Sequence, residues 1–453
     1  MVTLEQMLSA REARQARLTA ALVRAPLVSF TMNVAGPEKN SPLIRRGFLT
    51  GWRRLEDAFA AHGVALTLLE ETDEITGCEA LYAAGGCALT AKALCAACED
   101  ADELGRLFDM DVIDAHGRRI TRGELGLKER GCLVCGAQGR GCAARRVHSV
   151  EELQRETNRR LRGFFRELDK KTVADLATQS LLDEVRVTPK PGLVDRHNSG
   201  SHTDMDLQLF EKSAAALAPY WEACVNIGME SADLAPEETF FRLRRAGLNA
   251  EQTMFAATGG VNTHKGAIFL LGILCGAAGR LWRADEPCRD AKELCMECAR
   301  MTAAPLGVEL DDLAPDTAGA RLYLRHALRG ARGEVMDGLP GVWDVALPAL
   351  KEALALGCGR EHAAAVALLH LIARGTDTNM AKRGGMDGAA WGAQQARELL
   401  QRSAVPKIED IAALDEQFIE RNLSPGGCAD LLALTLFLHE WDALGHEERT
   451  SGE

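Results

Sequence analysis

The sequence lacks an apolar run long enough to cross a membrane. Even the apolar residues 267–278 are followed at once by Gly279 and Arg280, whereas a spanning helix needs about 20 such residues. Residues 1–24 are charged and amphipathic, and they lack the apolar segment and the cleavage site of a secretory signal. We therefore expect a cytoplasmic protein without membrane association.

The sequence also lacks an excess of basic residues. Lys and Arg number 53 against 65 Asp and Glu, which gives a net charge of −12. A chain of this charge is not expected to bind nucleic acid polymers or anionic membranes in general. The charge is unevenly distributed, because residues 1–168 carry 24 basic and 23 acidic side chains while residues 169–453 carry 29 and 42. This asymmetry, in a chain of 453 residues, predicts a fusion of two domains at 1–168 and 169–453.

No familiar nucleotide fingerprint is present. The P-loop spacing of two glycines, lysine and serine or threonine is missing, and no glycine motif follows a strand as a dinucleotide-binding motif must. Internal repeats and low-complexity tracts are absent too. We expect no organic cofactor beyond ATP as a substrate.

Fourteen cysteines would indicate a disulfide framework only in a short secreted chain, and here we expect reduced thiols. One short loop gathers possible zinc ligands, namely Cys132, Cys135, Cys142 and His148. Three thiols and an imidazole can close tetrahedrally on a zinc ion, although the spacing differs from that of a standard zinc finger. Reduced thiols without metal are the alternative.

Helices and short strands alternate in the first domain, which favours an α/β or α+β fold. Periodicity predicts helices over 4–23, 44–62 and 89–98 and strands over 27–32, 64–69 and 107–113. Residues 131–141 are predicted as a loop and 150–168 as a charged helix at the junction. The second domain is predicted to be nearly all helical, with helices over 172–187, 205–224, 236–246, 263–278, 289–302, 318–331, 343–355, 361–373, 389–403 and 425–438.

Two carboxylates stand out on the third predicted strand. Asp109 and Asp111 are two residues apart, so their side chains point to the same face of the strand. Paired carboxylates can hold Mg²⁺ for nucleotidyl transfer, and Glu99 adds a third acidic group nearby. A solvated strand face is the alternative interpretation.

The second domain contains four polar loops rich in glycine, over 184–206, 259–266, 377–385 and 422–430. Each has a structural explanation as a turn or a helix cap. Together they supply cations and carboxylates suited to a magnesium-triphosphate pocket. The candidate catalytic residues are Asp204, Asp206 and Asp377. The candidate substrate and phosphate ligands are Lys190, Asp195, His202, Asn262, His264, Lys265, Lys382, Arg383, Ser424, Gly426, Gly427 and Asp430.

Over most of residues 1–165 the chain resembles the apo-citrate lyase phosphoribosyl-dephospho-CoA transferase family. The resemblance is carried by residues 11–14, 31–39, 76–82, 105–112, 130–135 and 142–149. It implies transfer of a phosphoribosyl-dephospho-CoA group to a serine of the citrate lyase acyl carrier protein, with release of pyrophosphate. Asp109 and Asp111 are then expected to be catalytic, and Lys39 and Arg106 to bind the substrate.

From about residue 172 to 440 the chain resembles the triphosphoribosyl-dephospho-CoA synthase family. The strings at 188–195 and 422–430 are the most specific. The resemblance implies that the 2′-hydroxyl of 3′-dephospho-CoA replaces adenine at C1′ of ATP, which is N-glycosyl transfer through an oxocarbenium-like transition state. Lys190, Lys265 and Arg383 are then expected to bind the triphosphate, and some of Asp204, Asp206 and Asp377 to bind Mg²⁺.

The sequence therefore predicts a bifunctional enzyme whose partners are ATP, 3′-dephospho-CoA and the acyl carrier subunit of citrate lyase. One alternative is the same chemistry in the service of malonate decarboxylase. Another is that the first domain only binds the carrier protein.

Overall fold

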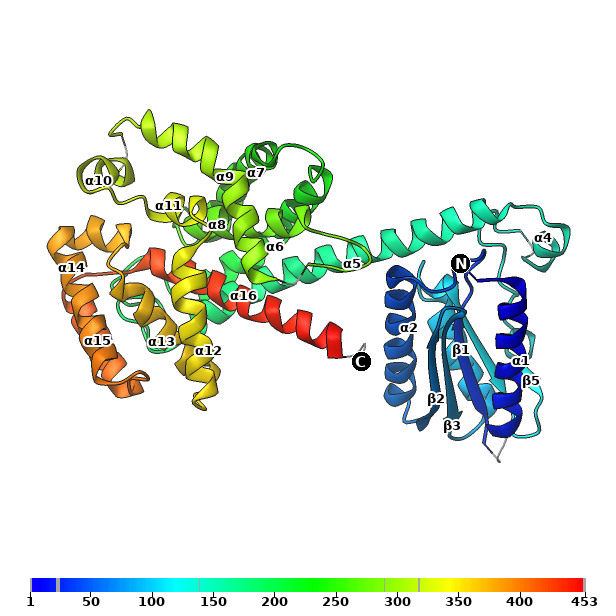
Figure 1. Cartoon of the computed structure of the whole chain (residues 1–453). Helices are drawn as coiled ribbons and strands as arrows, with labels where there is room; N and C mark the ends of the chain where they lie inside the picture. Colours follow the sequence, from blue (N-terminus) through cyan, green and yellow to red (C-terminus); the bar gives the residue numbers. More distant parts are fainter. Residues whose placement is uncertain (1, 22–24, 138, 289, 317, 451–453) are drawn as a thin grey trace. The chain divides into compact units, whose positions relative to one another are not determined.

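The computed structural model describes residues 2–21, 25–137, 139–288, 290–316 and 318–450. The chain forms two compact units, Met1–Leu168 with Arg283–Glu286, and Asp169–Trp282 with Pro287–Glu453. Helix α5 (Val150–Arg186) runs through the boundary at residue 168 (Figure 1).

The first unit is built on an antiparallel sheet. In chain order its elements are α1 (Leu4–Ala21), β1 (Leu27–Met32), α2 (Pro42–Ala61), β2 (Leu66–Glu74), β3 (Gly77–Ala84), α3 (Ala88–Asp100), β4 (Phe108–Ile113), β5 (Arg119–Ile120) and α4 (Gly139–Arg145). The strand order is β2-β3-β1-β4-β5. Ser41 caps the N-terminus of α2 with its side chain, and Pro42 occupies the first helical position, where its missing N–H costs nothing.

The two faces of this sheet differ in polarity because side chains alternate along each strand. On one face Phe30 stacks on Phe48 of α2, with ring centroids 4.7 Å apart, and meets the edge of Phe108 at 5.3 Å. On the other face Leu18 of α1 packs near Leu27. Helices α1 and α2 accordingly lie on opposite sides of the sheet (Figure 1). Farther along β1 from Leu27, the face under α1 carries polar side chains, some of which line a cavity of this unit.

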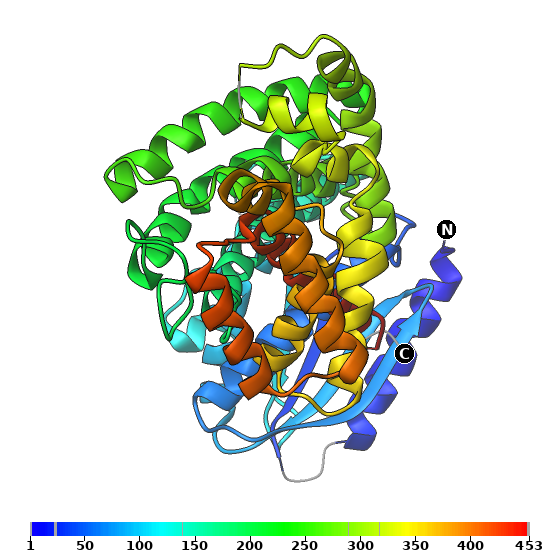
Figure 2. The same cartoon turned by 90° about the vertical axis from the view of Figure 1, so that its left-hand side faces the viewer.

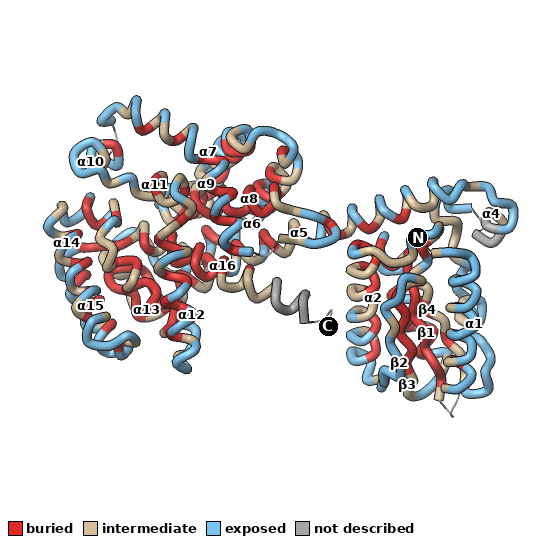
Figure 3. Tube along the Cα trace, in the orientation of Figure 1, coloured by how far each residue is buried: buried red, intermediate tan, exposed pale blue. Residues whose placement is uncertain are grey.

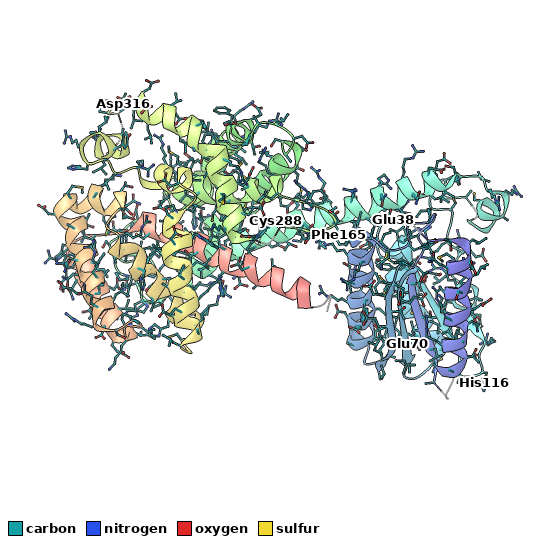
Figure 4. All side chains as sticks on the ribbon, in the orientation of Figure 1. Glu38, Glu70, His116, Phe165, Cys288 and Asp316 are labelled. Atoms are coloured by element: carbon teal, nitrogen blue, oxygen red, sulfur yellow. The ribbon has the colours of Figure 1, made fainter. Side chains whose placement is uncertain are left out.

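Helix α2 is also held by a contact on its far side. The guanidinium of Arg46 lies over the ring of Phe165 on α5, 4.1 Å from its centroid. Figure 4 labels Phe165 on its helix, together with Glu70 on β2. A cation over an aromatic face is attracted by the ring quadrupole, so this pair fixes α2 against the first part of α5.

The three predicted strands of the first unit are present, but β3 and β5 were not predicted. Strand β3 follows β2 after a two-residue turn and lies between β2 and β1. All pairings are antiparallel, so α+β is the correct alternative of the two fold classes. The expected loop 131–141 overlaps α4, and the helices expected at 150–168 and 172–187 are one continuous helix. Of the helix expected over 4–23, residues 22–23 lie outside the described residues.

The second unit is mostly helical, and α8 is deeply buried, since every residue from Ala267 to Arg280 except Phe269 lies in the core. Figure 2 shows the helices from a second direction, and Figure 3 shows the buried inner helices. Its helices after α5 are α6 (Leu207–Glu230), α7 (Pro236–Thr258), α8 (Lys265–Arg280), α9 (Ala291–Asp311), α10 (Ala318–His326), α11 (Gly330–Met336), a π-helical segment (Gly341–Ala346), α12 (Leu347–Ala355), α13 (Arg360–Ala373), α14 (Thr378–Arg402), α15 (Ile408–Glu420) and α16 (Gly426–Thr450).

Helices α6 and α8 cross with their backbones in contact. A β-carbon on Gly228 would collide with the carbonyl oxygen of Gly276, and one on Gly279 would collide with the carbonyl oxygen of Val225. Glycine at these positions therefore lets the two helix backbones approach each other closely. Beside the crossing, Arg280 forms a buried ion pair with Glu297 at 2.5 Å.

The second unit differs from the prediction in several places. The helix expected over 318–331 is interrupted at 327–329, between α10 and α11. The expected loop 377–385 is the start of α14, and only Gly385 departs from helical geometry, with φ 69° and ψ −177°. Helix α15 was not predicted. Among the described residues, no helix combines the length and the apolar character that a membrane span requires.

Candidate functional site

A cavity of about 160 Å³ in the first unit is lined from α1, the end of β1 and the beginning of β3. Its polar lining includes Arg11, Arg14, Thr31, Lys39 and Asp109. Thr31 and Asp109 face each other across the β1–β4 pair. The cavity therefore combines cationic groups from a helix and a loop with one carboxylate from the sheet.

The two aspartates of β4 have different surroundings. Burial, followed by the charge of Asp111, raises the pKa of Asp109. Arg130 holds the strand at this point, because it donates to the Phe108 carbonyl at 2.7 Å and lies 3.9 Å from the Asp109 carboxylate. Asp111 is in an ion pair with Arg119 and does not line the cavity. The predicted same-face placement is present, but the cavity receives only one of the two carboxylates.

The predicted ligands Lys39 and Arg106 are also separated. Lys39 lines the cavity and donates to the Val34 carbonyl, and burial together with the charge of Arg11 lowers its pKa. Arg106 does not line the cavity. It donates to the Gly131 carbonyl at 2.9 Å and so holds the start of the cysteine loop.

The cysteine loop brings its four predicted ligands together. The sulfurs of Cys132, Cys135 and Cys142 and a ring nitrogen of His148 all lie within 4.8 Å of one another. Within the described ranges, this is the only group of three or more His, Cys, Asp or Glu side chains so arranged. Nε2 of His148 is buried without a hydrogen-bond partner. Such a set of sulfur and nitrogen atoms fits a metal ion.

The thiols of this loop already differ in acidity. Although burial opposes the effect, hydrogen bonds from the backbone N–H groups of Cys135 and Val134 lower the pKa of Cys132. The hydrogen bond with Cys135 raises the pKa of Cys142 to about 11. A metal ion would need both sulfurs as thiolates, so its binding would release protons.

A cavity of about 700 Å³ in the second unit receives side chains from all four polar segments. Glu184 also lines it, although it was not singled out as a site residue. The predicted residues that line the cavity are Lys190, His202, Asp204, Asn262, His264, Lys265, Asp377, Lys382, Arg383, Ser424, Gly426, Gly427 and Asp430. The volume is that of a typical small-molecule site.

Asp195 and Asp206 do not line this cavity. Asp195 accepts hydrogen bonds from the backbone N–H groups of Lys190, His197 and Asn198 and thereby shapes the loop. Asp206 caps the N-terminus of α6 by accepting from Leu209 N–H at 2.8 Å. Both carboxylates serve local backbone structure, which their sequence context did not distinguish from substrate binding.

Three helices begin at the cavity wall. Its lining includes the first two residues of α8 (Lys265 and Gly266), of α14 (Thr378 and Asn379) and of α16 (Gly426 and Gly427). The first N–H groups of a helix have no partner within the helix, and its dipole is positive at that end. Asp377 and Asn262 already accept from the N–H groups of Met380, Cys428 and Lys265, so the three helix starts attract anions through the positive ends of their dipoles.

The cationic side chains at the cavity differ in their availability. Lys190 is buried and bonds to the Glu184 carboxylate at 2.6 Å, and Lys265 pairs with Glu251 at 2.7 Å. Arg383 donates to the carbonyl of Ser201 at 2.7 Å. In the part of the chain that the structure describes, neither Lys382 nor Arg383 has a carboxylate partner.

Two acidic groups at the cavity have shifted pKa values. Burial, followed by the charges of Glu184 and Asp377, raises the pKa of Asp430 well above its usual value. Burial also raises the pKa of Asp377, whose carboxylate accepts from the N–H groups of Met380 at 2.8 Å and Cys428 at 2.9 Å. Asp377 is thus occupied by backbone donors, whereas the backbone partner of Asp430 is the N–H of Ala267.

His264 presents an uncommitted nitrogen at the cavity. Its Nδ1 lies 2.8 Å from the hydroxyl of Ser213, while its Nε2 is buried without a partner. Burial, followed by the charge of Lys190, lowers the pKa of His264 to about 3. The imidazole is therefore neutral at physiological pH. The second histidine, His202, is held by a 2.8 Å hydrogen bond to Ser424.

Several residues at the two cavities were not predicted as site residues. Arg11 and Arg14 lie in a segment that carries the family resemblance, which is the signal that could have selected them. In the second unit, Arg374 and Glu334 line the cavity as an ion pair at 2.5 Å. They belong to no glycine-rich loop, so no sequence signal marked them.

Comparison with known proteins gives a separate match for each part of the chain. Residues 2–164 match the family model described as apo-citrate lyase phosphoribosyl-dephospho-CoA transferase. Residues 170–449 match that of ATP:dephospho-CoA triphosphoribosyl transferase.

Individual relatives match either nearly the whole chain or a little under two thirds of it. Protein CitXG of Haemophilus influenzae is 36% identical over 453 residues, covering 96% of each chain. The 2-(5″-triphosphoribosyl)-3′-dephosphocoenzyme-A synthase of Pectobacterium atrosepticum is 45% identical over 267 residues, which cover 58% of this chain and 86% of the relative. A probable synthase of the same name in Vibrio cholerae is 44% identical over 275 residues, covering 59% and 87%.

Proposed function

The chain belongs to the family of fused proteins that join an apo-citrate lyase phosphoribosyl-dephospho-CoA transferase to an ATP:dephospho-CoA triphosphoribosyl transferase, and we propose how its two cavities divide the work. The C-terminal domain makes 2′-(5″-triphosphoribosyl)-3′-dephospho-CoA from ATP and 3′-dephospho-CoA and releases adenine. The N-terminal domain transfers the phosphoribosyl-dephospho-CoA group to a serine of the citrate lyase acyl carrier protein and releases pyrophosphate.

The observation that carries the assignment of the larger cavity is the convergence of three helix N-termini with Lys382 and Arg383. The positive ends of helix dipoles and uncompensated cations attract the charge of a triphosphate. We place the triphosphate of ATP against the starts of α8, α14 and α16. Lys190 and Lys265 act less directly, since each already has a carboxylate partner.

Asp430 is the proposed proton donor in the first reaction. In this reaction the bond between C1′ of the ATP ribose and N9 of adenine breaks, and a bond forms from C1′ to the 2′-oxygen of dephospho-CoA. Departing adenine takes up one proton and the attacking hydroxyl loses one, so the overall reaction neither releases nor consumes a proton. A carboxyl group with a raised pKa keeps the proton that adenine needs.

Mg²⁺ fits this cavity when the substrate supplies most of its ligands. Asp204 lines the cavity and is exposed, whereas the oxygens of Asp377 accept backbone N–H groups. Protein sites for Mg²⁺ with nucleotides commonly use one or two carboxylates together with phosphate oxygens. We therefore assign Asp204 to the metal, which would offset the charge of the triphosphate.

For the second reaction we place the pyrophosphate group beside Arg11 and Lys39 and the carrier serine beside Asp109. The serine oxygen forms a bond to phosphorus, the bond to the pyrophosphate oxygen breaks, and the serine proton passes to a base. Asp109 suits that role because its raised pKa makes its carboxylate a better proton acceptor than an ordinary aspartate.

We further propose that the cysteine loop holds a structural Zn²⁺ ion through Cys132, Cys135, Cys142 and His148. The grouping of four soft or borderline ligand atoms and the unpartnered Nε2 of His148 support this assignment. Arg106 attaches the loop to the domain through the Gly131 carbonyl. The ion would join α4, which carries Cys142, to the turn that carries Cys132 and Cys135.

One assay tests both reactions. The purified chain is incubated with ATP, 3′-dephospho-CoA, Mg²⁺ and apo-carrier protein, and adenine, pyrophosphate and the mass of the carrier are measured. We expect adenine with or without the carrier, and pyrophosphate only when the carrier gains mass. Absence of adenine would overturn the synthase assignment, and adenine without carrier modification would overturn the assignment of the N-terminal cavity.

A further inference from the structure

A second cavity adjoins the proposed triphosphate cavity in the same unit. It has a volume of about 440 Å³ and is lined mainly by apolar and aromatic side chains from α6, α7, α8 and α10. Both cavities share Lys265, Gly266 and Thr378, together with residues 328–331. The two cavities therefore adjoin at the start of α8.

The two cavities differ in the charge they offer. In the second cavity Lys265 pairs with Glu251 at 2.7 Å, and Arg244 forms a two-point ion pair with Glu309. Arg329 is likewise paired with Asp337, and among the described residues Arg332 is the one cation of the lining without an ion pair, so the cavity offers a triphosphate little positive charge. Its remaining surface includes Phe240, Phe269 and other apolar groups, which suit a neutral ligand with apolar segments.

We propose that this second cavity binds the pantetheine arm of 3′-dephospho-CoA. The proposal rests on the synthase function assigned above and specifies where its second substrate lies. The arm is uncharged and combines two amides and a hydroxyl with methyl, methylene and thiol groups, and a diphosphate links it to the adenosine. The adenosine ribose of dephospho-CoA must reach C1′ of ATP, so the two substrates have to meet where the cavities adjoin, at the start of α8.

In this arrangement Gly266 and Asp430 lie where the two substrates would meet. Asp430 lines the first cavity and contacts Gly266, which lines both. A proton donor at this position stands between the two substrates. The arm contributes binding energy away from the reacting atoms, which holds the 2′-hydroxyl in position for attack.

Filling the cavity tests the proposal. Gly319 lines the cavity, and a β-carbon there would meet nothing within 4 Å. The substitution Gly319→Phe therefore adds a ring while its β-carbon collides with no other atom. We expect the KM for dephospho-CoA to rise about tenfold or more and the KM for ATP to stay within about twofold. The matched control is Gly163→Phe, at an exposed helical glycine of α5 with equally open surroundings.

A second pair of variants does not depend on filling the space. Leu248 lines the cavity at 59% exposure, and Leu356 is an equally exposed leucine, at 64%, that lines neither cavity. Leu248→Glu places a charge beside the arm and should raise the KM for dephospho-CoA, whereas Leu356→Glu should not. An unchanged KM for ATP shows in each case that the domain is folded.

A fragment of the substrate gives an independent measurement. 4′-Phosphopantetheine carries the arm without the adenosine, so it should inhibit the wild-type enzyme competitively with dephospho-CoA, and Gly319→Phe should weaken that inhibition. Unchanged kinetics for dephospho-CoA in both cavity variants would overturn the proposal, as would a rise confined to the KM for ATP. If the wild-type chain releases no adenine, the synthase assignment itself is overturned.

Discussion

The carboxylate of Asp430 fills the space that a β-carbon on Gly266 would need. The first turn of α8 and the start of α16 can approach each other at this point only because Gly266 has no side chain. Since Asp430 is the proposed proton donor, the position of the donor depends on the size of residue 266.

Replacing Gly266 with alanine should therefore displace Asp430 without removing it. A shift of about 1 Å in a catalytic group can cost about a hundredfold in rate, and we expect a loss of this order in kcat for adenine release. Gly163→Ala, in a helix with open space around the glycine, should leave kcat unchanged. Full activity of Gly266→Ala would contradict the proposed position of the donor.

The pH dependence of adenine release tests the role of Asp430. Its raised pKa means that the protonated, donating form persists to higher pH than in an ordinary aspartate. As pH rises through that pKa, the donor loses its proton, and kcat should fall. Asp430→Asn should reduce kcat by about 10²- to 10⁴-fold and abolish this decline. The exposed Asp387→Asn on α14 serves as the control, and a retained decline in Asp430→Asn would assign it to another group.

The uncompensated charge of Lys382 leads to a prediction about ATP. Lys382→Met should raise the KM for ATP about tenfold, which corresponds to about 1.4 kcal/mol of binding energy, because a phosphate would lose its cationic partner. Lys171→Met is the control, since Lys171 is exposed and pairs with Asp175 in the same helix. The KM for ATP is measured from initial rates at varied ATP concentration. Equal KM values for the two variants would exclude Lys382 from triphosphate binding.

The proposed base of the second reaction should affect only carrier modification. Asp109→Asn is expected to slow the gain in carrier mass by about 10²- to 10⁴-fold while adenine release continues at the wild-type rate. Asp57→Asn, at an exposed position on α2, should change neither reaction. If Asp109→Asn modifies the carrier normally, the N-terminal cavity is not where the serine reacts.

The zinc assignment predicts one metal ion per chain in elemental analysis of the purified protein. Removal by a strong chelator, or the substitution Cys135→Ser, should lower the thermal stability of the N-terminal domain, because metal binding contributes directly to the free energy of folding. Cys87→Ser, at an exposed cysteine outside the cluster, should retain both metal and stability. A protein that contains no zinc when expressed in zinc-supplemented medium would show that the thiols are simply reduced.

The sequence predicted those features that depend on local pattern. The alternation of β4 placed Asp109 and Asp111 on one face, and the glycine-rich strings identified residues that meet at one cavity although they are far apart in the chain. It did not predict that Arg119 would engage Asp111, because β5 consists of only two residues. Nor did it predict that Asp195 would serve its own loop, since a buried carboxylate that binds backbone N–H groups has the same sequence appearance as one that binds a substrate.

Long-range partners account for most of the remaining differences. Glu184 and Glu251 determine how much charge Lys190 and Lys265 can offer, and these pairings depend on how helices pack. The sequence did not predict strand β3. Polar residues of β2 and of the turn precede it, and its burial depends on its pairing with β1. Such features are properties of tertiary structure and leave little periodic signal in the chain.

The crossing of α6 and α8 restricts how this enzyme can be made more heat-resistant. Exchanging helical glycines for alanine is a common way to stabilise a protein, since alanine reduces the entropy of the unfolded chain. Gly163 should accept that exchange, but Gly228 and Gly279 should not, because each added methyl group would collide with the backbone of the other buried helix. Laboratory evolution for thermostability should therefore leave these two codons unchanged while it alters glycines on exposed helices.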